Sequence, residues 1–388
     1  MVEWKKLGDI MTIVRGASPR PIKNYITSDK EGINWIKIGD VAPGAKYITS
    51  SNEKITKEGA DKSRLLHSGD FILSNSMSFG RPYILKIDGC IHDGWIAMSD
   101  FEKHITPAFL YEILNSNSVQ DYWKMKANNG GAMTNLNSDI VRETTIPVPS
   151  LPEQQRIVGI LDKFISSIEN LKEQIAQRRK QYEYYRDQLL DLEGKEGVEM
   201  KTLGEIGEFV RGNGIQKNDF VEDGFGCIHY GQIHARYGFS AEETISKIEE
   251  SLYKKCKKAQ KGDVVLATTS EDAEGVAKPF VWLGDEEVAV SGDAFIFHHN
   301  QNGKFMGHQF LTHNFMQFKV KYATGAKVVR LSGENMAKYE VALPSLSEQQ
   351  RIVSILDTFE ASINNLEQQL AQREKQYEYY RNKLLTFE

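Results

Sequence analysis

Two stretches of about forty residues show a regular hydrophobic pattern. In residues 151–193, apolar side chains recur at alternating steps of four and three, the heptad pattern of a helix that buries one seam against another helix. Residues 346–388 repeat this segment at an offset of 195, with 29 of 43 positions identical. Each seam has one polar break, at Arg178 and at Arg373. The predicted seam residues are Ile157, Leu161, Phe164, Ile168, Leu171, Ile175, Tyr182, Tyr185, Leu189, Ile352, Leu356, Phe359, Ile363, Leu366, Leu370, Tyr377, Tyr380 and Leu384.

Both stretches begin with a helix-start signal. Ser150 with Glu153, and Ser345 with Glu348, have capping-box spacing just after a proline. About 40 helical residues at ~1.5 Å each extend over roughly 60 Å. A lone helix would leave its seam in water, so the other copy is the natural partner. If a pseudo-two-fold axis relates the two halves of the chain, the two helices run antiparallel.

The segments between these helices repeat more weakly. LGDIMTIVRG, from Leu7, resembles LGEIGEFVRG, from Leu203, and SGDFILS, from Ser68, resembles KGDVVLA, from Lys261. The sequence therefore predicts four segments: domain 1–150, helix 151–195, domain 196–345 and helix 346–388.

Each variable domain mixes short strands with helices. Apolar runs predict strands at 35–38, 70–74, 83–87, 264–268, 288–291 and 294–299, and amphipathic spacing predicts helices at 107–126 and 304–322. The predicted fold class is α+β: two similar α+β domains separated by two long helices in an antiparallel coiled coil, with internal pseudo-two-fold symmetry.

Composition limits the class of protein. The chain has 388 residues and a formal net charge of −5, which argues mildly against a simple nucleic-acid binder. No apolar run approaches the ~20 residues that span a bilayer, so we expect no membrane contact. Cys90, Cys227 and Cys256 form no C-x-x-C motif, which favours a reducing cytoplasm.

Catalytic motifs are missing from the sequence. It contains no G-x-x-x-x-G-K-[ST], no G-x-G-x-x-G and no H-E-x-x-H. His298 and His299 are adjacent in a predicted strand and lack metal-ligand spacing. We therefore expect no catalytic residue and no metal site.

Polar, glycine-containing loops are the candidate DNA contacts. In the major groove Arg can bond guanine bidentately, and Asn or Gln can bond adenine. Ordinary surface polarity is an alternative for any one of these residues. The basic run 252–261 could meet phosphates or be a solvated helix face. The candidates are Arg15, Ser18, Arg20, Lys23, Asn75, Ser76, Ser78, Arg81, Asn128 and Asn129 in the first domain, and Arg211, Asn213, Gln216, Lys217, His229, Tyr230, Gln232, His234, Arg236, Thr268, Thr269 and Ser270 in the second.

The whole pattern resembles one protein family. LPEQQRIVGILDKF and LSEQQRIVSILDTF each open a heptad helix, KQYEYYRDQLL and KQYEYYRNKLL follow, and a VRG motif lies near each domain start. These motifs are similar to those of the specificity subunits of type I restriction–modification systems, the HsdS family. The resemblance covers essentially the whole chain.

The resemblance implies a division of labour. Each variable domain would recognise one half of an asymmetric, bipartite site in double-stranded DNA. The helices would set the spacing and dock two methyltransferase subunits, and motor-nuclease subunits would join through that complex. This chain would bind no cofactor, because S-adenosylmethionine, ATP and Mg²⁺ would be bound by partner subunits.

Two tyrosines lie off the seam and are candidates for docking partner subunits. Tyr184 and Tyr379 could equally pack against the adjoining domain. Two other classes of protein stay open from the residues alone. One is a coiled-coil adaptor that binds proteins instead of DNA, and the other is part of a fused restriction–methylation enzyme.

Overall fold

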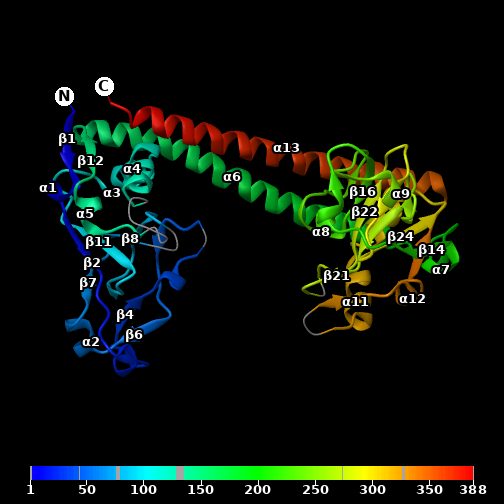
Figure 1. Cartoon of the computed structure of the whole chain (residues 1–388), viewed down its shortest axis with the longest axis horizontal. Helices are drawn as coiled ribbons and strands as arrows, with labels where there is room; N and C mark the ends of the chain where they lie inside the picture. Colours follow the sequence, from blue (N-terminus) through cyan, green and yellow to red (C-terminus); the bar gives the residue numbers. More distant parts are fainter. Residues whose placement is uncertain are drawn as a thin grey trace. The chain divides into compact units, whose positions relative to one another are not determined.

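The structure is a computed structural model that describes residues 2–42, 44–75, 79–127, 135–272, 274–325 and 328–387. It divides into two compact units that cut across the four segments of the sequence. The first unit contains residues 1–172 and 369–388, and the second contains residues 173–368. Each long helix therefore contributes to both units, and each unit contains one variable domain with a part of each helix (Figure 1).

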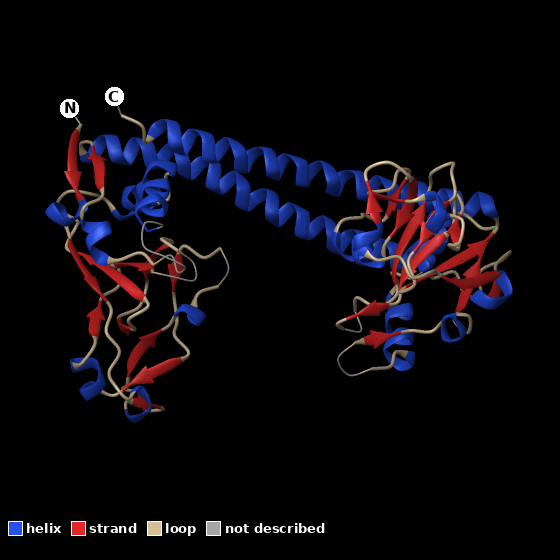
Figure 2. Ribbon diagram, viewed as in Figure 1, coloured by secondary structure: helices blue, strands red, loops and turns tan. Residues whose placement is uncertain are grey.

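Two five-stranded sheets form the body of the first domain (Figure 2). Both sheets are mixed, since β4 pairs with β10 and β5 with β9 in parallel, whereas the other pairs are antiparallel. One sheet has the order β2 (Thr12–Arg15), β11 (Trp95–Ser99), β8 (Phe71–Ser74), β9 (Pro82–Leu85), β5 (Tyr47–Ile48), and the other β3 (Ile26–Thr27), β6 (Glu53–Ile55), β4 (Ile33–Ile36), β10 (Gly89–Ile91), β7 (Arg64–Leu66).

The second domain repeats this topology strand for strand. Its sheets have the orders β14 (Gly207–Arg211), β24 (Ala294–His299), β20 (Val264–Ala267), β22 (Lys278–Trp282), β17 (Ser240–Ala241), and β15 (Phe220–Val221), β18 (Ser246–Ile248), β16 (Phe225–Ile228), β23 (Val288–Val290), β19 (Lys258–Ala259). A short pair, β21 (Thr269–Ser270) with β25 (Val329–Arg330), is added here. The repeat that is faint in the sequence is therefore complete in the fold.

A small ribbon joins each domain to the start of its long helix. The pair β1 (Glu3–Lys6) and β12 (Thr145–Val148) precedes α6 (Leu151–Leu190), and β13 (Glu199–Thr202) with β26 (Glu340–Leu343) precedes α13 (Leu346–Leu384). Short helices complete the domains: α1 (Leu7–Ile10), α2 (Lys57–Asp61), α3 (Pro107–Leu114), α4 (Asn117–Ala127), α5 (Ser138–Arg142), α7 (Leu203–Ile206), α8 (Tyr230–Ala235), α9 (Glu250–Tyr253), α10 (Gly303–Gln309), α11 (His313–Tyr322) and α12 (Gly333–Met336). No described helix is long and apolar enough to cross a membrane.

The helices predicted at 107–126 and 304–322 are each two helices, so that prediction was wrong. Side chains at the breaks bond backbone groups that a continuous helix would use. Ser116 donates its hydroxyl to the carbonyl of Ile113 at 2.7 Å, which ends α3. The hydroxyl of Thr312 donates to the carbonyl of Gln309 at 2.8 Å and accepts from the amide of Phe315, so it closes α10 and caps α11.

The two long helices run antiparallel in both units. In the first unit Phe164 stacks on Tyr380 with ring centroids 5.3 Å apart, and Lys172 pairs with Glu374. In the second unit Tyr185 stacks on Phe359 at 5.5 Å, and Arg179 pairs with Glu367. Residue numbers rise along α6 as they fall along α13 in each set. The predicted antiparallel pairing is confirmed.

The seam is shared between the helix pair and the domain cores. At the start of each helix, Ile157, Leu161, Ile352 and Leu356 belong to the cores of the domains that precede them. Further along, Ile168, Leu171 and Ile175 are buried, whereas Tyr185 and Tyr380 keep exposed fractions of 45% and 41% although their rings stack. The remaining predicted seam residues are partly buried: Phe164, Tyr182, Leu189, Phe359, Ile363, Leu366, Leu370, Tyr377 and Leu384.

The predicted capping boxes are only partly formed. Ser345 accepts a long hydrogen bond, 3.4 Å, from the amide of Glu348. The carboxylates of Glu153 and Glu348 each receive two hydrogen bonds from the arginine three residues on, Arg156 and Arg351. These bidentate pairs occupy the carboxylates of both glutamates, the one in α6 and the one in α13.

Candidate nucleic-acid interface

Polar side chains from two loops of the first domain meet at Asp93, in the turn between β10 and β11. Ser18 donates its hydroxyl to the Asp93 carboxylate at 2.9 Å, and Arg20 donates to the other carboxylate oxygen at 3.4 Å. Arg15 and Asn75 donate to the Asp93 backbone carbonyl at 3.0 and 3.2 Å. We call these five residues the Asp93 cluster.

The negative charge of Asp93 helps to orient the arginine side chains of this cluster. The Ser18 hydroxyl lowers the pKa of the Asp93 carboxyl, so the side chain stays ionised near neutral pH. The two guanidinium groups are exposed, and the Arg20 side chain retains 82% of its accessible surface. Exposed ion pairs of this kind are weak, so a phosphate or a base edge could replace the aspartate as the arginine's partner.

A close backbone approach explains the glycine in both VRG motifs. A Cβ atom on Gly16 would lie 2.1 Å from the His92 carbonyl oxygen, and one on Gly212 would lie 2.3 Å from that of Ser291. Only glycine lets the first strand meet the turn so closely. The preceding arginine then reaches the turn, with the Nε atoms of Arg15 and Arg211 donating to the carbonyls of Asp93 and Gly292.

The second domain assembles a similar group around its own turn. Arg211 lies 3.9 Å from the Asp293 carboxylate, to which the Thr269 hydroxyl donates at 3.3 Å. The amide of Tyr230 donates to the Ser291 hydroxyl at 2.9 Å, and a ring nitrogen of His234 lies 3.0 Å from the Thr269 carbonyl. Three predicted loops therefore meet here. We call these six residues the Asp293 cluster.

Several candidates do not support base contacts. His229, Gln232 and Thr268 are 6%, 7% and 5% exposed, and burial also lowers the pKa of His229. Gln232 donates to the Ser246 hydroxyl, and Asn213 accepts from the amide of Lys257, so both side chains hold the loops together. The three buried side chains are not accessible to a base edge in this structure, and their role as DNA contacts stays a prediction.

The remaining candidate residues fall into three groups. Ser270 lies in β21, and Arg81 follows the loop at the end of β8. Four exposed side chains are tied to neither cluster by a described side-chain contact: Lys23, Gln216, Lys217 and Arg236. Ser76, Ser78, Asn128 and Asn129 lie outside the described residues. In the basic run, Lys254 and Lys261 pair with Glu250 and Asp285.

Sequence reasoning missed Asp93, Asp293 and Ser291 in these clusters, and Arg330 and Lys319 close to them in the fold or chain. Asp93 and Asp293 lie in turns that carry no basic or amide-rich motif, so nothing marked them in the sequence. Arg330 is exposed and lies across from Thr269 in the β21–β25 pair. Lys319 is buried and donates to the carbonyls of Glu274 and Val276, which holds the loop after β21.

Each variable domain is held to the long helices by two hydrogen bonds, one made by a glutamine and one by a tyrosine of those helices. The side-chain oxygen of Gln154 accepts from the amide of Thr106, just before α3, and Gln349 does the same for Asn302 before α10. Further along these helices, Tyr377 donates to the Glu112 carboxylate at 2.6 Å, and Tyr182 bonds His308 at 3.1 Å. Both glutamines are fully buried, so each domain has a defined orientation on its helices.

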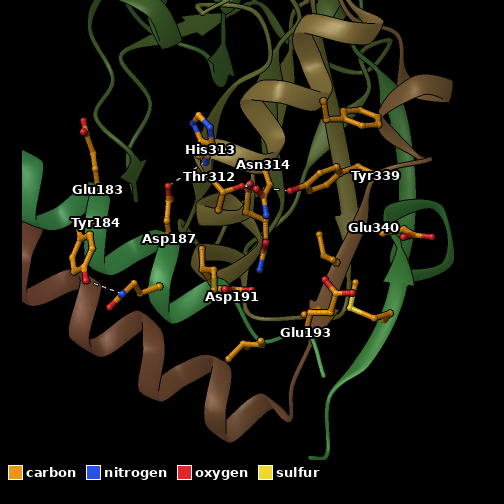
Figure 3. Close-up of a pocket in the computed structure, with 18 of the residues that line it drawn as sticks. Glu183, Tyr184, Asp187, Asp191, Glu193, Thr312, His313, Asn314, Tyr339 and Glu340 are labelled. Atoms are coloured by element: carbon orange, nitrogen blue, oxygen red, sulfur yellow. Dashed lines mark hydrogen bonds between the residues drawn. The ribbon is translucent and has the colours of Figure 1, made fainter. Parts of the chain in front are cut away.

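A groove of about 980 Å³ lies beside Tyr184 at the end of α6 in the second unit (Figure 3). Glu183, Asp187, Asp191, Glu193 and Glu340 line it with two lysines, Lys180 and Lys338, so carboxylates predominate. Tyr184 is 58% exposed, and its counterpart Tyr379 in the first unit is 60% exposed. Neither tyrosine is packed away in its domain, which leaves both rings available to a partner.

Comparisons with known proteins agree with this architecture. Residues 1–178 and 195–374 each match the family described as "Type I restriction modification DNA specificity domain". The EcoR124I/EcoR124II specificity subunit of Escherichia coli is 32% identical over 259 residues, which is 63% of this chain and 63% of that protein. The chain thus spans less than two thirds of this relative.

Two further matches cover nearly the whole chain. A putative type I restriction enzyme specificity subunit of Haemophilus influenzae is 26% identical over 403 residues, spanning 100% of this chain and 96% of that protein. A solved structure titled as the structural basis of complex assembly and conformational transition of the type I R-M system has a TM-score of 0.67 and 16% identity. It covers 99% of this chain and 97% of that chain, and supports the fold.

The repeated α+β domains, each with a polar cluster at a sheet turn and each attached to an antiparallel helix pair, define a protein built from two tandem copies of one domain and helix unit. The chain belongs to the type I restriction modification DNA specificity domain family. The relatives are named as specificity subunits, and none of those described here is named as a methyltransferase or nuclease. This agrees with the expectation that the chain is not itself an enzyme.

Proposed function

We propose that the chain is the non-catalytic DNA-specificity subunit of a type I restriction–modification complex. Each variable domain recognises one half of an asymmetric, bipartite site in double-stranded DNA. The observation that carries the proposal is the repetition of one topology around two unlike polar clusters, at Asp93 and at Asp293. A shared scaffold with different loop chemistry is what two half-sites of different sequence require.

The two clusters supply the proposed DNA contacts. In the first domain these are Arg15, Ser18, Arg20 and Asn75, with Arg81 near the same loop. In the second they are Arg211, Tyr230, His234 and Thr269, with Arg330 across from Thr269 in the β21–β25 pair. The aspartates orient the arginines before DNA arrives, which reduces the conformational entropy that these side chains lose on binding. Because the chain's formal charge is −5, the proposal includes partner subunits that supply positive charge near the DNA.

Methylated-base sequencing in cells that carry the complete system tests this function. Arg15→Ala should weaken or relax methylation at bases of one half-site, whereas Arg211→Ala should affect the other half. Lys163→Ala, an exposed change on α6, is the control. If both arginine variants altered the same half, or neither did, two independently acting domains would be ruled out.

Methyltransferase subunits are the proposed partners of the helix pair. The exposed Tyr184 and Tyr379 support docking there, and the acidic groove beside Tyr184 suits a basic segment. Motor-nuclease subunits then join through the methyltransferases, and S-adenosylmethionine, ATP and Mg²⁺ are bound by partner subunits. Three free cysteines favour a cytoplasmic location.

Capture of co-expressed methyltransferase subunits on the tagged chain tests the docking surface. Tyr184→Ala and Tyr379→Ala should each reduce the methyltransferase recovered, while Lys163→Ala should not. Full recovery with both tyrosines replaced would move the docking surface elsewhere and leave the DNA proposal standing.

A further inference from the structure

The apolar seam cannot tell the two long helices apart. Position by position, α6 and α13 carry the same seam side chains, apart from Ile175 in one and Leu370 in the other. Two α6 helices from separate copies of the chain could therefore form nearly the same antiparallel seam, and so could two α13 helices. Something other than the seam must favour the pairing of α6 with α13 within one chain.

Two ion pairs join α6 to α13 among the described residues, one in each unit. Lys172 lies 3.3 Å from Glu374, and Arg179 lies 2.5 Å from Glu367. The offset of 195 makes position 172 equivalent to 367 and position 179 equivalent to 374. Both basic residues are thus on α6, and both acidic residues occupy the equivalent positions of α13.

This distribution makes like helices repel each other. In an antiparallel pair of two α6 helices, Lys172 of one copy would face Arg179 of the other, twice. In a pair of two α13 helices, Glu367 would face Glu374, again twice. Like charges at facing positions destabilise by about as much as opposite charges stabilise. The cross-pair α6–α13 is the combination in which every one of these charges is matched.

We propose that Lys172, Arg179, Glu367 and Glu374 form a pairing code that selects the α6–α13 pair over a pair of two α6 helices or two α13 helices from separate copies of the chain. The code excludes assemblies in which two like helices pair across copies of the chain. It does not depend on what the domains bind.

The size of the effect follows from the exposure of these side chains. Each is between 41% and 61% exposed, so each ion pair should be worth only a factor of about 1.4 to 5 in an equilibrium constant. Replacing two attractions by two repulsions of similar size raises that factor to the fourth power, which gives roughly fourfold to six-hundredfold. Water and salt reach these sites, so the effect should shrink as ionic strength rises.

Charge exchange in the full chain tests the code. Lys172→Glu with Arg179→Glu makes both helices acidic, and Glu367→Lys with Glu374→Arg makes both basic. We expect hydrogen exchange in both helices to quicken roughly fourfold to six-hundredfold in either double variant at low salt. The quadruple variant, which exchanges the charges between helices, should return to the wild-type rate. In 1 M salt the four proteins should converge.

A capture experiment tests selection against other copies. When the acidic and basic double variants carry different tags and are co-expressed, their helices are complementary only between chains, so they should co-purify more than two tagged wild-type copies do. Wild-type copies that co-purify as well as the variants would overturn the code. So would a quadruple variant that exchanges as fast as the doubles, or doubles that match the wild type.

Discussion

Leu385, just after α13, is predicted to stabilise the first variable domain, more than two hundred residues earlier in the sequence. It is 4% exposed and belongs to the same apolar core as Phe71, Ile96 and Trp123. Its counterpart at the offset of 195 is Leu190, which is 6% exposed in the core of the second domain. The two leucines form a matched pair of probes, one for each unit.

Leu385→Ala removes buried methyl groups and leaves a cavity. Such changes in well-packed cores cost about 2–5 kcal/mol. Because Leu385 lies near a helix end, where the chain can partly relax, we expect about 3 kcal/mol. If the first unit opens as one cooperative body, that loss speeds hydrogen exchange in its core strands by roughly a hundredfold.

Hydrogen exchange followed by mass spectrometry on the full chain measures this prediction. In Leu385→Ala, peptides covering β8 and β11 should exchange faster, while peptides covering β20 and β24 should keep the wild-type rate. Leu190→Ala should give the reverse pattern. Equal acceleration of both sets in either variant would refute the division into two units, and no change in β8 and β11 would refute the role of Leu385.

Three further predictions concern individual sites. Burial raises the pKa of Glu360 to about 7, so between pH 4.5 and 7 the folded state keeps a proton that the unfolded state has lost. The free energy of unfolding should therefore fall by at most about 3 kcal/mol over this range. Glu360→Gln should abolish this pH dependence in urea titrations. Burial lowers the pKa of Lys319 to about 8, so stability should rise from pH 8 to 10.5, and Lys319→Met should remove that rise in the same titrations. Gly212→Ala should abolish recognition of one half-site while sparing the other, measured by methylated-base sequencing, because its Cβ would meet the Ser291 carbonyl; an unchanged methylation pattern would contradict the close approach.

The sequence predicted the long helices and their antiparallel pairing well because both follow from a repeated pattern of apolar side chains. Strand positions were close too, as at β8 and β20, where a short apolar run fills a buried strand. The breaks at Ser116 and Thr312 were missed because a side chain that bonds its own helix end leaves the hydrophobic period almost intact.

The polar clusters were predicted in part. Arg15, Ser18, Arg20 and Asn75 were expected as loop residues, but only the fold brings them to one aspartate. Burial of His229 and Gln232 could not be foreseen, since their polarity suggested solvent. The docking role of Tyr184 and Tyr379 stays a prediction, because exposure shows availability and not a bound partner.

The placement of residues 369–388 in the first unit has a consequence for how the protein is made. The first variable domain ends near residue 150, yet part of its core comes from Leu385. On a ribosome that adds about 5–20 residues per second, roughly 10–45 seconds separate the emergence of these two regions. During that interval the newly made domain exposes an apolar surface, so nascent chains should be bound by chaperones until the final helix arrives.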